Sequence, residues 1–282
     1  MLPKFFSRFR KPKPGKNQVK KKRRLPQIGK RQKFVIFVII LSAGLFSSEY
    51  FFSGYSLAIA FILGFLTDVF LMITLFEDLQ ENFSVQPFIL PFLCSLSFGL
   101  FYFLAPSRLI TRIVFTSIYA VGLYSIFLSE NIFVVASIRT IALLNSARII
   151  TFITSLVSFF FLSNIIFSLH INVMPTIFLF AVMSSLMVLH TLWTYTLSKS
   201  LQDDIPWVSI LTISLTEIAA ILWFWPTSPT VMSLFLTSSF YILTGLMHVW
   251  LDRRLFKNVI WEYMWVAVVA TFILLWFTSW QG

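Results

Sequence analysis

The sequence predicts an all-α polytopic membrane protein, a bundle of about nine transmembrane helices, and three observations lead to this fold class. Hydrophobic residues make up 58% of the chain and charged residues only 12%, far from the ~45–50% and ~25% that are usual in soluble domains. The apolar residues form runs of about 20, which is the length of helix that crosses a bilayer. The runs do not alternate apolar and polar residues, as barrel strands do. Helices are therefore expected, because in lipid the backbone must satisfy its own hydrogen bonds.

The distribution of charged residues along the chain changes at Phe34. Residues 1–33 contain 14 of the 22 Lys and Arg residues and no acidic residue, whereas the remainder contains 8 basic and 11 acidic residues. This composition predicts a basic cytoplasmic arm over 1–33 that is disordered when free. A single transmembrane domain is expected over 34–282, because no later soluble segment is long enough to fold alone.

The part of the arm next to the first span is its most basic part. Anionic headgroups attract each such residue with about 1 kcal/mol near the membrane surface. Lys and Arg also neutralise nucleic-acid phosphates, but no folded recognition module fits in this short arm, so nucleic acid is not the expected partner. The residues expected to contact anionic lipid are Lys20, Lys21, Lys22, Arg23, Arg24, Lys30, Arg31 and Lys33.

Nine spans follow from the apolar runs, and prolines and tryptophans mark their ends. Pro87, Pro106, Pro206, Pro226 and Pro229 lie at predicted ends, where a missing N–H costs least. Most tryptophans also lie near ends, as in the aromatic belts of membrane proteins. The predicted spans are 34–53, 55–76, 87–105, 109–129, 149–170, 172–193, 206–225, 229–251 and 259–280.

Basic residues predict the orientation of these spans. Lys and Arg are enriched on the cytoplasmic side, so the arm places the N-terminus in the cytoplasm. With nine spans, Lys199 and the cluster of Arg253, Arg254 and Lys257 share that side. Arg108 and Arg112 lie on the other side and are exceptions.

The segment 132–148 needs a separate interpretation. If it crossed the membrane, there would be ten spans and the cluster near Arg253 would move outside. At 100° per residue, Arg139 and Ser146 lie on one stripe of a helix, while Asn145 and Arg148 lie nearly opposite. Two polar stripes predict a buried or re-entrant helix that does not span.

Among the charged residues of the spans and this segment, four are the candidate intramembrane polar site: Asp68, Arg112, Arg139 and Glu217. An uncompensated charge at the bilayer centre costs at least ~2.5–3.5 kcal/mol. We therefore expect either ion pairs that hold helices together, such as Glu217 with Arg139 and Asp68 with Arg112, or a water-filled cavity. In the cavity, Glu217 or Asp68 would carry a proton or bind a cationic group.

A polar pair lies at the predicted cytoplasmic end of the eighth span. His248 and Asp252 are four residues apart, so one helix face presents both and the carboxylate can orient the ring. Such a pair occurs in acid–base or metal sites, and also as an interfacial histidine beside a loop charge. His190 is also expected near a cytoplasmic span end. The single cysteine, Cys94, excludes an intramolecular disulfide and a cysteine cluster, and we expect neither metal nor another cofactor.

Enzymatic activity is not the favoured interpretation. The common nucleotide-binding, metalloprotease and serine-hydrolase motifs do not occur. Glu77-Asp78 and Asp203-Asp204 could hold a divalent cation and a lipid phosphate, although adjacent loop carboxylates are usually just solvated.

Three functions remain. The first is a permease-like protein with a polar cavity near Glu217, Asp68 and Arg139. The second is a non-catalytic component that assembles with or anchors a protein partner in the membrane. The third is a membrane-embedded enzyme that acts on a lipid-linked substrate.

The stretch that runs from Glu130-Asn131-Ile132-Phe133 to Asn145-Ser146-Ala147-Arg148 resembles a segment of uncharacterised polytopic membrane proteins from bacteria with reduced genomes. The resemblance covers this stretch, and the layout of spans agrees with it. It implies a multi-pass protein of the bacterial cytoplasmic membrane and no known activity.

Overall fold

The computed structural model describes residues 29–52, 55–79, 84–104, 108–137, 143–197, 204–253 and 256–279. Within these ranges the chain forms nine α-helices and no strand, and each helix is long and apolar enough to cross a bilayer. The predicted all-α transmembrane bundle is therefore confirmed. The helices are α1 (Lys30–Phe52), α2 (Ser56–Leu79), α3 (Gln86–Leu104), α4 (Leu109–Ala136), α5 (Leu144–Ser168), α6 (Val173–Thr196), α7 (Ile205–Trp223), α8 (Pro229–Leu251) and α9 (Lys257–Trp276).

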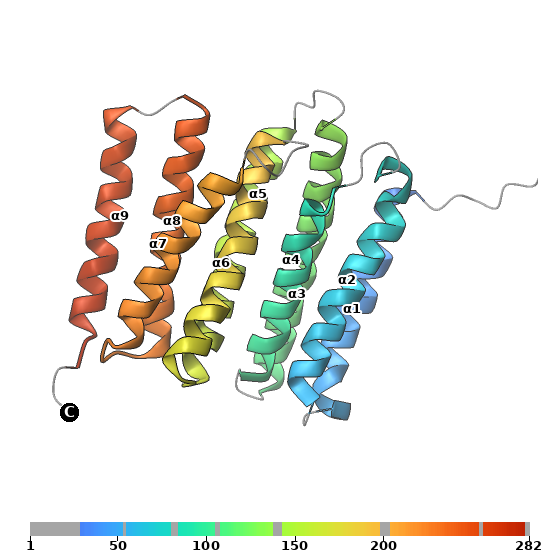
Figure 1. Ribbon diagram of the computed structural model, residues 1–282. Helices are drawn as coiled ribbons and strands as arrows, with labels where there is room; N and C mark the ends of the chain where they lie inside the picture. Colours follow the sequence, from blue (N-terminus) through green and yellow to red (C-terminus); the bar gives the residue numbers. More distant parts are fainter. Residues whose placement is uncertain are drawn as a thin grey trace, which may run out of the picture.

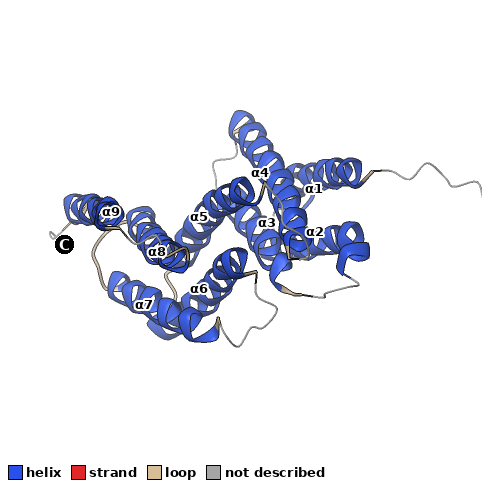
Figure 2. Ribbon diagram, turned by 90° about the horizontal axis from the view of Figure 1, so that it is seen from above, coloured by secondary structure: helices blue, strands red, loops and turns tan. Residues whose placement is uncertain are grey.

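The helices stand side by side, and successive helices run in opposite directions (Figure 1). Seen from above, α1 to α4 form one end of an elongated bundle, and α5, α8 and α9 continue it as a row with α6 and α7 alongside (Figure 2). The upper end in Figure 1 is where α5, α7 and α9 begin and where α4, α6 and α8 end. Residues that meet at this end come from distant parts of the chain.

The described residues of the segment 132–148 belong mostly to two long helices and not to a separate one, contrary to the sequence-based expectation. Its first residues extend α4 to Ala136, and its last residues begin α5 at Leu144. The α4 helix continues past the predicted span end because residues 130–136 contain neither Gly nor Pro and are mostly apolar. Residues 138–142, which include Arg139, lie outside the described residues.

Hydroxyl groups inside the bundle mostly bond to their own helices. Ser42, Thr191 and Thr244, for example, each donate to the carbonyl oxygen four residues earlier. This local bond satisfies a polar group where lipid and apolar side chains offer no partner. The cost of these hydroxyls in the membrane is thereby kept low without a connection between helices.

A chain of buried hydroxyls is different, because it joins three helices. Thr67 of α2 lies 2.7 Å from Ser95 of α3, and Ser95 lies 2.9 Å from the hydroxyl of Tyr119 of α4. Close backbone approach supports the same contact, since a Cβ on Gly99 of α3 would lie 3.1 Å from the Cβ of Ala60. Small residues and shared hydrogen bonds are typical of helix contacts within membranes.

The α9 helix has a narrower attachment. It packs on α8 and buries only Ala270 and Leu274. In this contact Tyr263 lies directly against Gly245 of α8, where an added Cβ would come within 2.6 Å of the tyrosine ring. The missing side chain at Gly245 therefore leaves the space that the tip of the Tyr263 side chain occupies.

We expect Gly245→Leu to loosen α9, because the new side chain would occupy the space of the Tyr263 ring. The free energy of unfolding in detergent should fall by about 1–3 kcal/mol, the usual cost of overpacking. Gly122→Leu in α4 is the matched control, since nothing lies within 4 Å of a Cβ at Gly122. Adding Tyr263→Ala to Gly245→Leu should recover part of the loss. Equal melting temperatures for Gly245→Leu and Gly122→Leu would contradict this account of the contact.

Candidate functional site

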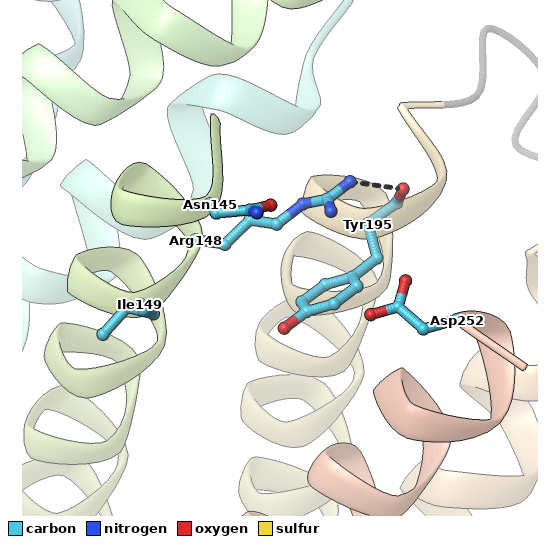
Figure 3. Close-up of a pocket in the computed structure, with 5 residues that line it drawn as sticks. All are labelled: Asn145, Arg148, Ile149, Tyr195 and Asp252. Carbon is cyan, nitrogen blue, oxygen red and sulfur yellow. Dashed lines mark hydrogen bonds between the residues drawn. The ribbon is translucent and has the colours of Figure 1, made fainter. Parts of the chain in front are cut away.

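A pocket of about 450 Å³ opens at the upper end of the bundle, where α5, α6 and α8 meet. Figure 3 shows Arg148 reaching from α5 towards Tyr195 of α6, with Asp252 beside the tyrosine. The pocket is lined by Asn145, Arg148 and Ile149 of α5, Tyr195 of α6, and Asp252, which follows α8. Polar and charged groups therefore line a cavity at a helix end, the position of a membrane protein's headgroup region.

Local packing puts Arg148 in this pocket. The preceding residue, Ala147, is buried with Phe133 of α4 and Trp193 of α6 in a small apolar cluster. Phe133 and Trp193 pack edge to face at 6.0 Å between ring centres. Because Ala147 holds the first turn of α5 against this cluster, Arg148 is directed towards the end of α6.

The guanidinium of Arg148 is fixed by the end of α6. Its Nε donates to the carbonyl oxygen of Thr194 and its Nη2 to that of Tyr195, both at 3.0 Å. Carbonyls in the last turn of a helix lack intrahelical donors, so the arginine supplies them and also complements the negative helix end. Arginine has five N–H groups. Those that do not bond to α6 make no hydrogen bond to another described residue and can donate to a ligand.

Tyr195 forms the wall beneath the arginine. The Arg148 guanidinium carbon lies 4.5 Å from the centre of the Tyr195 ring, a cation–π contact. The same ring stacks on His248 of α8, with 3.7 Å between centres and 11° between planes. His248 and Arg148 must occupy opposite faces of the ring, because one face has no room for both. Three helices are thereby locked together under the pocket.

Asp252 gives the pocket a negative side. It caps the end of α8, and its carboxylate is exposed. No ion pair joins it to Arg148 among the described residues, although both line the same cavity. The pocket thus offers a cation from α5 and an anion from the end of α8 to one ligand.

The predicted pairing of the His248 and Asp252 side chains is not found. Only the backbone joins them, with the Asp252 N–H donating to the His248 carbonyl oxygen at 3.0 Å. His248 is 4% exposed and lies beneath Tyr195, while Asp252 faces the pocket. The helix ends between the two residues, so the carboxylate does not orient the imidazole.

A buried ionisable pair was not predicted from the sequence. Oε1 of Glu130 in α4 lies at hydrogen-bond distance, 2.9 Å, from Nε2 of His190 in α6, and both side chains are 0% exposed. The second carboxylate oxygen of Glu130 and Nδ1 of His190 have no hydrogen-bond partner among the residues that the structure describes. The sequence did not reveal this pair, because the fourth span was predicted to end at residue 129, one residue before Glu130. The apolar run after Glu130 was the signal that the helix continues.

The four predicted intramembrane charges do not form one site. Asp68 lies half-buried in α2. Arg112 lies in the first turn of α4, and no ion pair joins it to Asp68. Glu217 is exposed on α7, far along the bundle from α2 (Figure 2). Arg139 lies outside the described residues. Because α2 and α7 are far apart, the structure does not bring Asp68 and Glu217 together in the expected cavity.

The other residues singled out in the sequence lie at the ends of helices or outside the described ranges. Lys30, Arg31 and Lys33 lie at the start of α1, whereas the densest basic run, 20–24, lies outside the described residues. Glu77 and Asp78 belong to the last turn of α2, and Asp203 is outside the described ranges. Asp204 is 5% exposed and accepts a hydrogen bond from Thr196, so it is not a solvated loop carboxylate. Within the described residues, no cluster of three His, Cys, Asp or Glu side chains could hold a metal.

We expect Glu130→Ala and His190→Ala each to destabilise the protein by about 3–5 kcal/mol, since either change leaves a buried polar partner alone. The double variant Glu130→Met/His190→Phe should lose much less, because two apolar side chains of similar size need no partner. Chemical or thermal unfolding of all three variants in the same detergent measures the difference. If the double variant loses as much as the two single ones combined, the pair contributes through something other than mutual hydrogen bonding.

Comparison with known proteins identifies the family of this protein but indicates no activity. No curated protein and no solved structure matches the chain significantly. One family model, described as a protein of unknown function (DUF5656), matches residues 35–277, a range that runs from α1 to the residue after α9. This agrees with the uncharacterised family expected from the sequence. The match covers most of the chain, and the protein therefore belongs to the DUF5656 family of proteins of unknown function.

Proposed function

We propose that this membrane protein binds a phosphate-bearing amphiphile, a phospholipid or lipid-linked molecule, with its headgroup in the pocket of Arg148, Tyr195 and Asp252. The observation that carries the proposal is an arginine held by two carbonyl oxygens inside a pocket at the helix ends. The basic arm supports a cytoplasmic location for this end, with Arg253 and Lys257 on the same side. The membrane would be the bacterial cytoplasmic membrane, and the arm would contact its anionic lipids.

A phosphate suits the positive side of the pocket. The planar guanidinium presents parallel N–H groups that match phosphate oxygens. Two of its bonds are already made to α6, so little side-chain freedom is lost when a ligand binds. Asn145 lies in the first turn of α5 and Arg148 begins the second, and no side chain caps the N-terminal N–H groups of this helix. The positive end of this helix therefore adds to the attraction for an anion.

The negative side of the pocket favours a headgroup that also carries an amine. Asp252 caps α8, where the helix dipole is negative, and it lies across the pocket from Arg148 (Figure 3). An ammonium group near Asp252 and a phosphate near Arg148 would complement both charges. A zwitterionic headgroup such as phosphoethanolamine is the simplest chemistry of this kind.

A groove in the membrane region can hold an acyl chain. It has a volume of about 400 Å³ and lies between α4 and α5, with Gly122, Val121, Ile153 and Val157 among its lining residues. Exposed Ile149 lines the headgroup pocket, and Ile153 lies one turn further along α5. From Arg148 the groove residues are about 7 to 14 Å deeper at 1.5 Å per residue. A chain attached to a bound headgroup would reach them.

Transport of such an amphiphile, a lipid permease, is the role we favour among the three functions considered from the sequence. The pocket offers a surface for the headgroup and the groove offers one for the acyl chain, and both are lined by residues of α5. Each lies at the depth that the corresponding part of a lipid occupies in a membrane. An enzyme that acts on the same lipid-linked substrate is the alternative, and the Asp252 carboxylate within the pocket is the observation that favours it.

We expect Arg148→Gln to weaken binding of phosphatidylethanolamine by about 10- to 100-fold, the loss of charge-assisted hydrogen bonds worth ~1.5–3 kcal/mol. Native mass spectrometry of the purified protein with added lipid measures retention. Arg253→Gln is the matched control, because it removes an equal charge at the same end of the bundle without touching the pocket. A folded Arg148→Gln variant that retains the lipid as wild type does would refute the proposed site.

The groove can be tested separately. Gly122→Leu should not destabilise the protein, because nothing lies within 4 Å of a Cβ at Gly122, while the leucine fills the space for an acyl chain. We expect affinity for long-chain phosphatidylethanolamine to fall by about 3- to 10-fold, the effect of one or two buried methylenes. Binding of water-soluble glycerophosphoethanolamine, measured by calorimetry, should be unaffected. Loss of both ligands would mean that the substitution acts on the pocket, and loss of neither would remove the groove from the site.

A further inference from the structure

The outward face of α7 carries a carboxylate within the membrane. This helix buries only Leu211, Leu215, Ala219 and Leu222 among its residues, and it lies at the edge of the bundle (Figure 2). Glu217 is exposed, because at 100° per residue it points away from the buried face that Leu215 marks.

The surroundings of Glu217 are apolar and deep. Ile213 and Ile221, one turn to either side, are 58% and 61% exposed. Glu217 lies six residues before the end of α7 and twelve after its start, or about 9 Å and 18 Å at 1.5 Å per residue. Both distances place it inside a hydrocarbon core about 30 Å thick. Among the described residues no hydrogen bond or ion pair reaches its carboxylate.

A carboxylate at this depth needs a donor, and the described residues supply none. Lipid tails offer none, which is why ionisable residues inside a membrane usually have a partner or a function. Lipid amines stay in the headgroup region and do not reach it. A second copy related by a two-fold axis along the membrane normal would bring an identical carboxylate to the same depth, and like charges repel.

We infer that the outward face of α7 binds a transmembrane helix of a partner protein, and that this helix presents an Arg or Lys opposite Glu217. Charge complementarity identifies the partner's chemistry. Ser214 and Ala220, three residues before and after Glu217, are small enough to let another helix approach closely. The surface consists of Ile213, Ser214, Glu217, Ala220 and Ile221. This inference does not depend on the lipid site, which lies on α5, α6 and α8.

The test uses defined helices in place of an unknown partner. Cys94, which is fully buried, is changed to Ala, and Ile213→Cys supplies a thiol beside Glu217. Two single-span Leu/Ala helices with a matching cysteine are reconstituted with the protein in phosphatidylcholine vesicles. One carries Arg at the depth of Glu217 and the other carries Leu. We expect about 5- to 30-fold more disulfide with the Arg helix, the ratio that corresponds to interhelical polar bonds of ~1–2 kcal/mol, and no preference after Glu217→Gln.

A transplanted carboxylate provides the matched control. Ile62 of α2 is 63% exposed and lies six residues from the start of its helix, about 9 Å from the same side of the membrane as Glu217. Ile62→Glu, with Phe65→Cys and Glu217→Gln, offers the same charge on a different face. We expect this variant to capture the Arg helix poorly.

Three results would overturn the inference. Equal capture by the transplanted carboxylate would mean that a charge alone suffices and that α7 is not a docking surface. Equal crosslinking of the Arg and Leu helices would remove the role of Glu217. Predominant crosslinking of Ile213→Cys between two copies of this protein would assign the face to self-association. Melting temperatures of the Glu217→Gln and Ile62→Glu variants establish that each remains folded.

Discussion

Hydrogen bonds that lipid cannot supply are the constraint on which the rest of this structure depends. A polar group inside the membrane must find its partner within the protein. Most hydroxyls meet this requirement along their own helix, as Ser42 and Thr244 do. Where the requirement is met between helices, the contact fixes their relative position. Thr67, Ser95 and Tyr119 do so for α2, α3 and α4, and the contact of Glu130 with His190 does so for α4 and α6.

The same constraint explains why the candidate site lies at the helix ends. The last carbonyl oxygens of α6 lack donors, and Arg148 of a neighbouring helix supplies them. Fixing the arginine in this way also holds its charge beside Tyr195, which is itself stacked on His248. A structural requirement of one helix thus produces an ordered cation in a pocket. The opposite dipoles of α5 and α8 place complementary potentials on its two sides.

Glu217 departs from this pattern among the described residues, because it faces outward and has no hydrogen-bond or ion-pair partner in that part of the chain. The two proposed sites are separate, since the lipid pocket and the outward face of α7 lie on different surfaces. A protein that binds an amphiphile on α5 while α7 contacts a partner helix would combine two of the functions considered from the sequence, a lipid permease and a membrane assembly component.

The sequence alone determined the fold class, a bundle of about nine helices long and apolar enough to cross a membrane, because the length and composition of an apolar run are local properties that the bilayer thickness selects. It also located charged residues within the membrane. Only the tertiary structure decided which of them meet. Arg148 and Tyr195 are 47 residues apart and Glu130 and His190 are 60, while Asp68 and Glu217 belong to distant helices. Helical periodicity assigns a residue to a face, but the neighbour of that face depends on the packing of the whole bundle, which no local pattern encodes.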